Sequence, residues 1–148
     1  MNRIALLALL ASMLLLAAAC GGGEKNGQEE EGGAANAQAV AACNGTALTE
    51  TPKLPASFPM VEDTTFTKQS TQGPTEVVEG YWKGSLEDAH DEYKKELEAA
   101  GYDIVFDELE DHDSEVSWKG EGRTGQVALR EECGDSDKIY VHITNRPA

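Results

Sequence analysis

The most regular hydrophobic pattern in the chain lies between Ser85 and Gly101. Apolar residues recur there at intervals of three and four positions, which places them on one face of a helix. Ser85 is a suitable N-cap, Asp88 completes a capping box, and Gly101 supplies a helix stop. The sequence therefore predicts one amphipathic helix whose opposite face is charged and solvated. Its apolar face comprises Leu86, Ala89, Tyr93, Leu97 and Ala100.

Short segments on both sides of this helix alternate between apolar and polar residues, as strands do. The most regular is 138–144, where Ile139, Val141 and Ile143 face one side. The links between the segments after the helix are short enough for hairpins. The other predicted strands are 61–68, 75–83, 102–109, 115–119 and 126–130.

The order β-β-α-β-β-β-β predicts an α+β fold with two layers. An antiparallel sheet of about four to six strands would be covered on one face by a single helix. In 102–109, the alternation places Tyr102, Ile104 and Phe106 on the same side of the sheet. The other face of the sheet is expected to be open to water or to a partner. It would carry Val105, Lys119, Arg130, Tyr140 and His142.

The N-terminus has a different pattern. One positive charge, on Arg3, precedes the uncharged run 4–19, which ends at Cys20 and three glycines. A helix that spans a bilayer needs about 20 apolar residues, so this run is short for a permanent span. Its layout is that of a signal peptide, and we expect residues 1–19 to be removed during export.

The segment Leu16-Ala17-Ala18-Ala19-Cys20 resembles the lipobox of bacterial lipoproteins. The resemblance covers residues 1–20, and Ala17 stands where a larger aliphatic residue is more common. It implies that Cys20 becomes the mature N-terminus, carries acyl chains such as palmitate, and anchors the protein to a membrane outside the cytoplasm. The location is then the cell surface or the periplasm. An ordinary cleavage site that leaves Cys20 free is the alternative.

Residues 20–42 are rich in glycine, alanine and glutamate, and Val40 is their one large aliphatic residue. Such a segment has little to bury, so we expect a flexible tether that begins at the lipidated cysteine. The folded part is then 43–148, which is long enough for one small α+β domain with a modest core. Within it, the proline-rich segment 51–59 is read as an extended connector that packs Leu54 and Phe58 against the domain.

The remaining two cysteines and the net charge limit the classes of function. With Cys20 assigned to lipid, Cys43 and Cys133 are an even pair in an oxidising compartment, and we expect a disulfide between them; two free thiols are the alternative. The chain has 27 acidic residues against 12 lysines and arginines, a net charge of −15. Such a surface repels polyanions, so nucleic acid is excluded as a partner, whereas basic partners remain open.

Few residues suggest chemistry. His90, His112 and His142 lie in no recognised catalytic motif, and the chain has no GxSxG motif, phosphate-binding glycine loop or CxxC pair. We therefore predict that the protein is not an enzyme and has no cofactor and no resident metal. The acidic run 107–115 does not match an EF-hand loop; a solvated hairpin is expected, with a weak cation site as the alternative.

The aromatic residues of the sheet region are the remaining candidates for binding. Trp82 and Trp118 fall on the core side by alternation, and an exposed tryptophan beside Tyr140 and His142 would form an aromatic patch for a glycan or a partner protein. The leading hypothesis is a non-catalytic, lipid-anchored domain that binds another envelope component or a small ligand. A structural or assembly-supporting envelope protein without a small-molecule site is the alternative.

Overall fold

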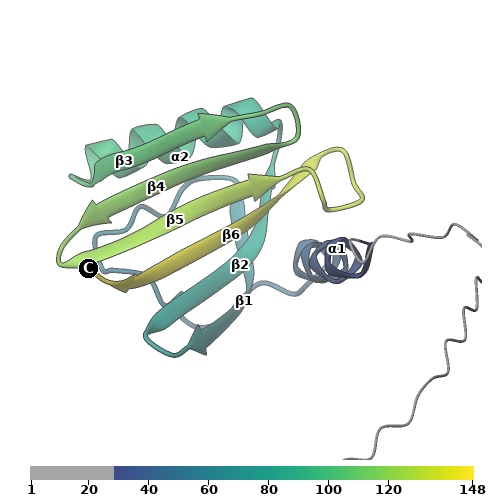
Figure 1. The fold of residues 1–148 in the computed structure, drawn as a ribbon, viewed down its shortest axis with the longest axis horizontal. Helices are drawn as coiled ribbons and strands as arrows, with labels where there is room; N and C mark the ends of the chain where they lie inside the picture. Colours follow the sequence, from purple (N-terminus) through teal and green to yellow (C-terminus); the bar gives the residue numbers. More distant parts are fainter. Residues whose placement is uncertain (1–28) are drawn as a thin grey trace, which may run out of the picture.

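The computed structural model describes residues 29–148. The predicted signal peptide, Cys20 and the first part of the predicted tether lie outside these residues. The described part contains two helices and six strands (Figure 1). In chain order they are α1 (Glu29–Cys43), β1 (Thr64–Gln72), β2 (Thr75–Lys83), α2 (Leu86–Ala99), β3 (Asp103–Leu109), β4 (Asp113–Gly120), β5 (Arg123–Arg130) and β6 (Lys138–Pro147).

The six strands form one antiparallel sheet in the order β1-β2-β6-β5-β4-β3. Hairpins join β1 to β2 and connect β3, β4 and β5. Strand β6 lies between β2 and β5 and pairs with both, so it joins these two groups of strands into one sheet. The predicted α+β class and the antiparallel sheet are therefore confirmed. The predicted order β-β-α-β-β-β-β is matched from β1 onward, with α2 as its helix. The prediction is incomplete because a second helix, α1, precedes the sheet and packs on its other face.

Helix α2 covers one face of the sheet and encloses the main core. The Ser85 hydroxyl accepts a hydrogen bond from the Asp88 backbone N–H at 3.1 Å, and Gly101 follows the helix end with a φ of +86°, which suits glycine. Four of the five residues predicted on the apolar face are buried, whereas Ala100 is exposed beyond the helix end. The helix lies against β3, β4 and β5. Its buried side chains belong to one core cluster with residues of the inner strands, namely Val78, Val116, Trp118, Val127, Leu129, Ile139, Val141 and Ile143.

Helix α1 lies on the opposite face, against β2, β6 and β1, so the prediction of a flexible tether is wrong for its last part. The helix has no apolar stripe of its own. Instead, the small residues Ala39 and Ala42 allow it to approach the sheet closely, and Cys43 forms the predicted disulfide with Cys133. The Lys138 ammonium donates to the Cys43 carbonyl at 3.3 Å, near the negative end of the helix dipole.

Strand β3 contains an irregularity that changes the face of one predicted core residue. Ile104 pairs with Trp118, but the register shifts by one residue and Phe106 pairs with Ser117. Cross-strand partners share a face, so Phe106 lies on the face away from α2. The placement of Phe106 beside Ile104 is therefore wrong, because the bulge at Val105 interrupts the alternation.

The two edge strands of the sheet, β1 and β3, differ in what lies beside them. The connector after α1 runs along β1, where the Leu48 N–H donates to the Phe66 carbonyl at 2.8 Å and the Lys53 N–H donates to the Gln69 side chain at 2.9 Å. This connector also buries Phe58 and partly buries Leu54, as predicted. Strand β3 forms the other edge, and no strand within residues 29–148 pairs with its outer side.

Candidate functional site

The four residues predicted to bind a ligand do not lie together. Trp118 is fully buried and Trp82 is 7% exposed, and both belong to the core beneath α2. Tyr140 and His142 lie on the other face of the sheet, where Tyr140 is covered by α1. The aromatic patch that required an exposed tryptophan beside Tyr140 is therefore not formed.

A buried carboxylate lies beneath α1 instead. Glu79 in β2 is only 1% exposed, and its carboxylate accepts hydrogen bonds from the Tyr140 hydroxyl at 2.7 Å and from the Gln38 amide at 2.6 Å. The Lys68 ammonium lies 2.8 Å from the other carboxylate oxygen. His142 is the cross-strand neighbour of Glu79. This network joins α1 to three strands of the sheet.

The charges in this network follow from burial and hydrogen bonding. Burial alone would raise the pKa of Glu79, but hydrogen bonds from Lys68, Tyr140 and Gln38 outweigh it and hold the pKa below its ordinary value. Burial and the hydrogen bond to this carboxylate raise the pKa of Tyr140. Burial lowers the pKa of His142. The network therefore holds an ionised carboxylate next to a neutral phenol and an uncharged imidazole at neutral pH.

A serine, a histidine and an aspartate meet between α2 and the sheet. The Ser114 hydroxyl lies 2.6 Å from His90 Nδ1, and an oxygen of Asp107 lies 3.1 Å from His90 Nε2. Lys94 also pairs with Asp107. These residue types form hydrolase triads, in which the hydroxyl must reach a substrate. Ser114 is only 1% exposed and lies in the wall of the core, so the arrangement fixes α2 to β3 and β4 and presents no accessible nucleophile.

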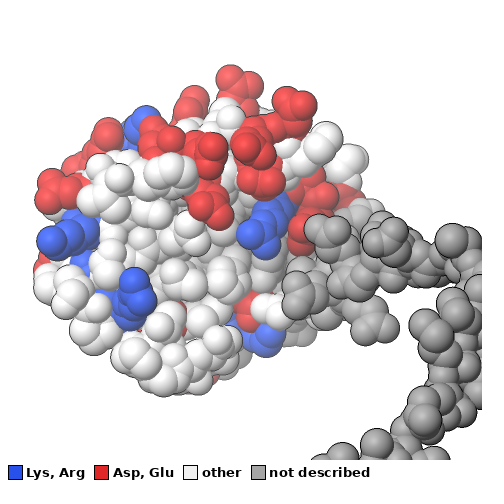
Figure 2. All heavy atoms as spheres, viewed as in Figure 1, with Lys and Arg blue, Asp and Glu red and all other residues white. Residues whose placement is uncertain are grey.

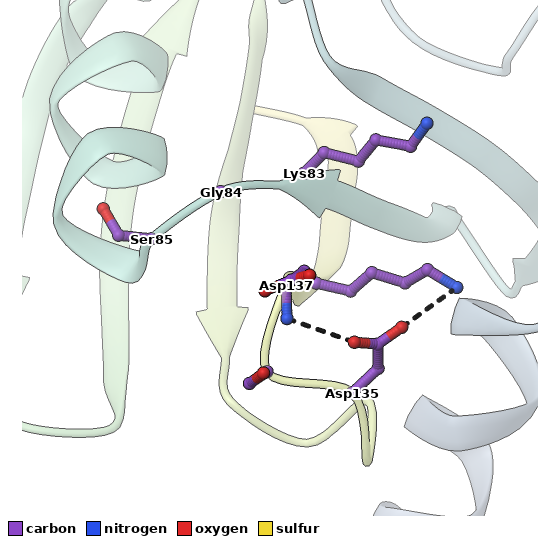
Figure 3. A pocket seen from close by; sticks show the side chains of 7 residues that line it. Lys83, Gly84, Ser85, Asp135 and Asp137 are labelled. Carbon is purple, nitrogen blue, oxygen red and sulfur yellow. Dashed lines mark hydrogen bonds and ion pairs between the residues drawn. The ribbon is translucent and has the colours of Figure 1, made fainter.

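A hollow of about 690 Å³ lies where the β5–β6 loop approaches the start of α2 (Figure 3). Its lining mixes lysines and aspartates, and Asp135 is already paired with the Asp137 N–H at 3.2 Å and with the Lys138 ammonium at 3.8 Å. Figure 3 shows the side chains of Lys83 and Ser85 directed away from Asp135. The lining therefore does not converge on one point where a ligand would be held.

A second hollow, of about 510 Å³, lies on the half of the sheet that α1 leaves uncovered. Phe106 and Val105 stand at its β3 side and are 47% and 59% exposed. Most of its other residues carry hydroxyl or amide groups, so an aromatic ring lies beside hydrogen-bonding groups and one guanidinium. Its lining residues are Thr75, Val105, Phe106, Ser117, Thr124, Gly125, Gln126, Thr144 and Arg146.

Charge is unevenly distributed around this face. Figure 2 shows the face that Figure 1 presents; uncharged residues fill its middle, and acidic residues gather along the edge that holds α2 and β3. Residues 85–119 contain thirteen carboxylates against three lysines.

The predicted hairpin around His112 is confirmed as the β3–β4 turn. The imidazole lies 2.9 Å from Glu131, and the hydrogen bond between them raises the pKa of His112.

Two further features bear on ligands and membranes. Within the described part of the chain, no group of three or more histidine, cysteine, aspartate or glutamate side chains is arranged to hold a metal ion. Neither of the helices at residues 29–43 and 86–99 has the length and apolar character needed to cross a bilayer.

Sequence reasoning missed the Glu79 network and the exposure of Phe106. The one signal for the first is an acidic residue in the middle of the apolar run 77–82, which calls for a partner wherever both faces of a strand are covered. The partner Gln38 came from a segment predicted to be flexible. No pattern in 102–109 indicates the bulge that turns Phe106 outward.

Comparison of the chain with protein-family models, with curated proteins and with solved structures gives no match in any of the three.

Proposed function

We propose that this chain is a lipid-anchored protein of the cell envelope whose folded domain binds a protein partner through the uncovered half of its sheet. This surface consists of the outward-facing residues of β3, β4, β5 and the C-terminal part of β6. Binding, and not catalysis, is the activity that these residues support. The observation that carries the proposal is the exposed Phe106 beside a hydroxyl-lined hollow on a sheet face that α1 covers only in part.

The anchor is supported by the sequence up to Cys20 and by the disulfide. A lipobox-like segment follows an uncharged apolar run, and a disulfide between Cys43 and Cys133 suits an oxidising compartment outside the cytoplasm. Two or more acyl chains on Cys20 would hold the protein stably at a membrane.

Partner binding is supported by the chemistry of the surface. Aromatic residues that stand out from a face rimmed with polar groups are typical anchors of protein interfaces. The lining of the hollow includes one charged side chain, Arg146, and no cluster of converging charges, which favours a polypeptide over a small ion. The carboxylates around α2 and β3 favour a partner with basic residues.

The anchor is tested by the intact mass of the protein extracted from membranes, with Cys20→Ser as the control. We expect the native protein to carry the added mass of a diacylglyceryl group and the variant to leave the membrane fraction. An unlipidated mass for the membrane-bound protein would refute the anchor.

The binding surface is tested by photo-crosslinking in cells that produce the anchored protein. A photoreactive amino acid is placed at position 117 or 144, on the uncovered half of the sheet, and at position 87, on the outer face of α2, as the control. We expect one discrete adduct from the first two positions, lost on Phe106→Ser, and none from position 87. Equal adducts from all positions would indicate nonspecific contact and contradict the proposal.

A further inference from the structure

No strand among residues 29–148 covers the β3 edge of the sheet, whereas the connector after α1 covers the β1 edge. In the connector, the backbone N–H of Leu48 donates to the Phe66 carbonyl of β1, and the backbone N–H of Lys53 donates to the Gln69 side chain. Within residues 29–148, β3 pairs only with β4. An edge strand whose outer backbone groups are free is a template for another strand.

Exposed apolar side chains are concentrated on this open edge. Four large hydrophobic residues in the described part of the chain are exposed, and three of them belong to β3. Val105, Phe106 and Leu109 are 59%, 47% and 44% exposed. Proteins usually blunt a free edge with charged residues, prolines or a bulge, and β3 has both carboxylates and a bulge at Val105. Its exposed apolar residues are not among these protective features, and together with the carboxylates they favour an edge that a partner uses.

The charges on this edge have a single sign. Every charged residue of β3 and its turn up to residue 111 is acidic: Asp103, Asp107, Glu108, Glu110 and Asp111. A second copy of the chain would bring these carboxylates against identical ones, which opposes pairing between two copies. A strand that carries lysine or arginine is attracted by the same field.

We propose that β3 accepts a basic, extended segment of a partner protein as a seventh strand of the sheet. This inference rests on the proposed function and names the kind of segment that binds. Pairing would run along Phe106–Leu109, because the register with β4 is regular there, whereas the bulge interrupts it at Val105. Backbone hydrogen bonds would supply affinity, and the exposed side chain of Phe106 would select an apolar residue on the uncovered face of the sheet, whereas Leu109, the cross-strand partner of Ser114, lies on the α2 face.

The test uses the Cys20→Ser protein and a synthetic peptide of alternating lysine and valine. Its first control is a peptide with the same side chains and charge but with methyl groups on alternate backbone nitrogens, which removes the donors needed for pairing. Binding is followed by amide chemical shifts in nuclear magnetic resonance spectra. We expect the largest shifts at residues 106–109, and an affinity at least about tenfold lower for the methylated peptide.

Two variants separate strand addition from general attraction between opposite charges. The double variant Glu108→Lys and Glu110→Lys reverses charge on the β3 edge, while Glu50→Lys and Glu62→Lys make the same change in the connector on the β1 side. We expect the double variant at Glu108 and Glu110 to lower the affinity for the lysine-containing peptide by about tenfold at low salt, and less when salt screens the charges. The double variant at Glu50 and Glu62 should leave this affinity unchanged.

Three results would overturn this inference. They are equal binding of the methylated peptide, equal effects of the two double variants, and shifts that map away from β3. A crosslink at position 117 or 144 together with one of these results would leave the partner-binding surface in place and remove the strand addition alone. Loss of both the crosslink and the peptide shifts would remove the proposed function as well.

Discussion

Glu79 shows how a single buried charge is accommodated on the covered half of the sheet. Its two carboxylate oxygens accept from Tyr140, Gln38 and Lys68, which come from β6, α1 and β1. Lys68 is half exposed, so its ion pair is screened by water and contributes little. The hydrogen bond from the buried Tyr140 contributes more, because a buried carboxylate without donors is costly; the bond from Gln38, whose side chain is exposed, is only partly buried.

Replacing Glu79 with glutamine should lower the free energy of unfolding by about 1–3 kcal/mol. The carboxylate has two acceptor oxygens, whereas the amide has one, and its NH2 group cannot accept a hydrogen bond from the neighbouring donors. Urea unfolding of the Cys20→Ser protein measures the change. Glu98→Gln, at an exposed position on α2, is the matched control and should change the same quantity by less than about 0.5 kcal/mol. Equal effects of the two variants would contradict the network.

His142 and Glu79, both beneath α1, should each contribute to the pH dependence of stability. The folded-state pKa of His142 lies below its ordinary value of 6.5, so the unfolded state binds more protons, and stability falls as the pH drops from 6.5 through the folded value. Glu79 acts in the same direction below its ordinary pKa of 4.5. The slope below pH 6.5 should be smaller in His142→Gln, and the slope below pH 4.5 should be smaller in Glu79→Gln, where Glu76, whose pKa is also lowered, keeps part of it. Unchanged slopes in both variants would refute these assignments.

At the scale of elements, α1 depends on its contacts more than on its own sequence. It contains two adjacent glycines, at positions 32 and 33, and its apolar residues form no stripe. Helices of this length are marginal in isolation. Close packing through Ala39 and Ala42 and the covalent link at Cys43 hold it on the sheet.

Substituting Ala39 with glutamate should release α1, because the fully buried position has no room for a longer, charged side chain. Hydrogen exchange should then be faster in α1 while amides of β4 and β5 stay protected. Ala41→Glu, at an exposed position of the same helix, should leave the exchange of α1 unchanged. Slow exchange of α1 in the Ala39 variant would contradict this account.

The elements differ in how far the sequence reveals them. Helix α2 has a cap, a stop and an apolar face, all of them local signals, and β6 alternates without interruption. Helix α1 and the bulge at Val105 have no such signals, because both are fixed by tertiary contacts and pairing register. The candidate surface was predicted as an open face of the sheet, but its exposed aromatic residue, Phe106, was predicted to lie on the other side.

At the scale of the whole molecule, the disulfide closes a loop across most of the folded chain. Cys43 and Cys133 are 90 residues apart in sequence. Removing both, as Cys43→Ala with Cys133→Ala, should lower the free energy of unfolding by about 4–5 kcal/mol in the chain-entropy treatment. Urea unfolding with and without a reductant measures this. The reductant should destabilise only the protein that has both cysteines; destabilisation of the double variant would point to another cause.

The same bond determines how mechanical force would pass from an anchored Cys20 into the domain. Tension from the membrane would enter through α1 and cross from Cys43 to Cys133, which lies in the loop that joins the inner strands β5 and β6. The force would not pass through the connector or the β1 edge. If a partner pulled on β3, the force would act on the pairing between the inner strands. As long as the disulfide is intact, this force would not separate the connector from β1.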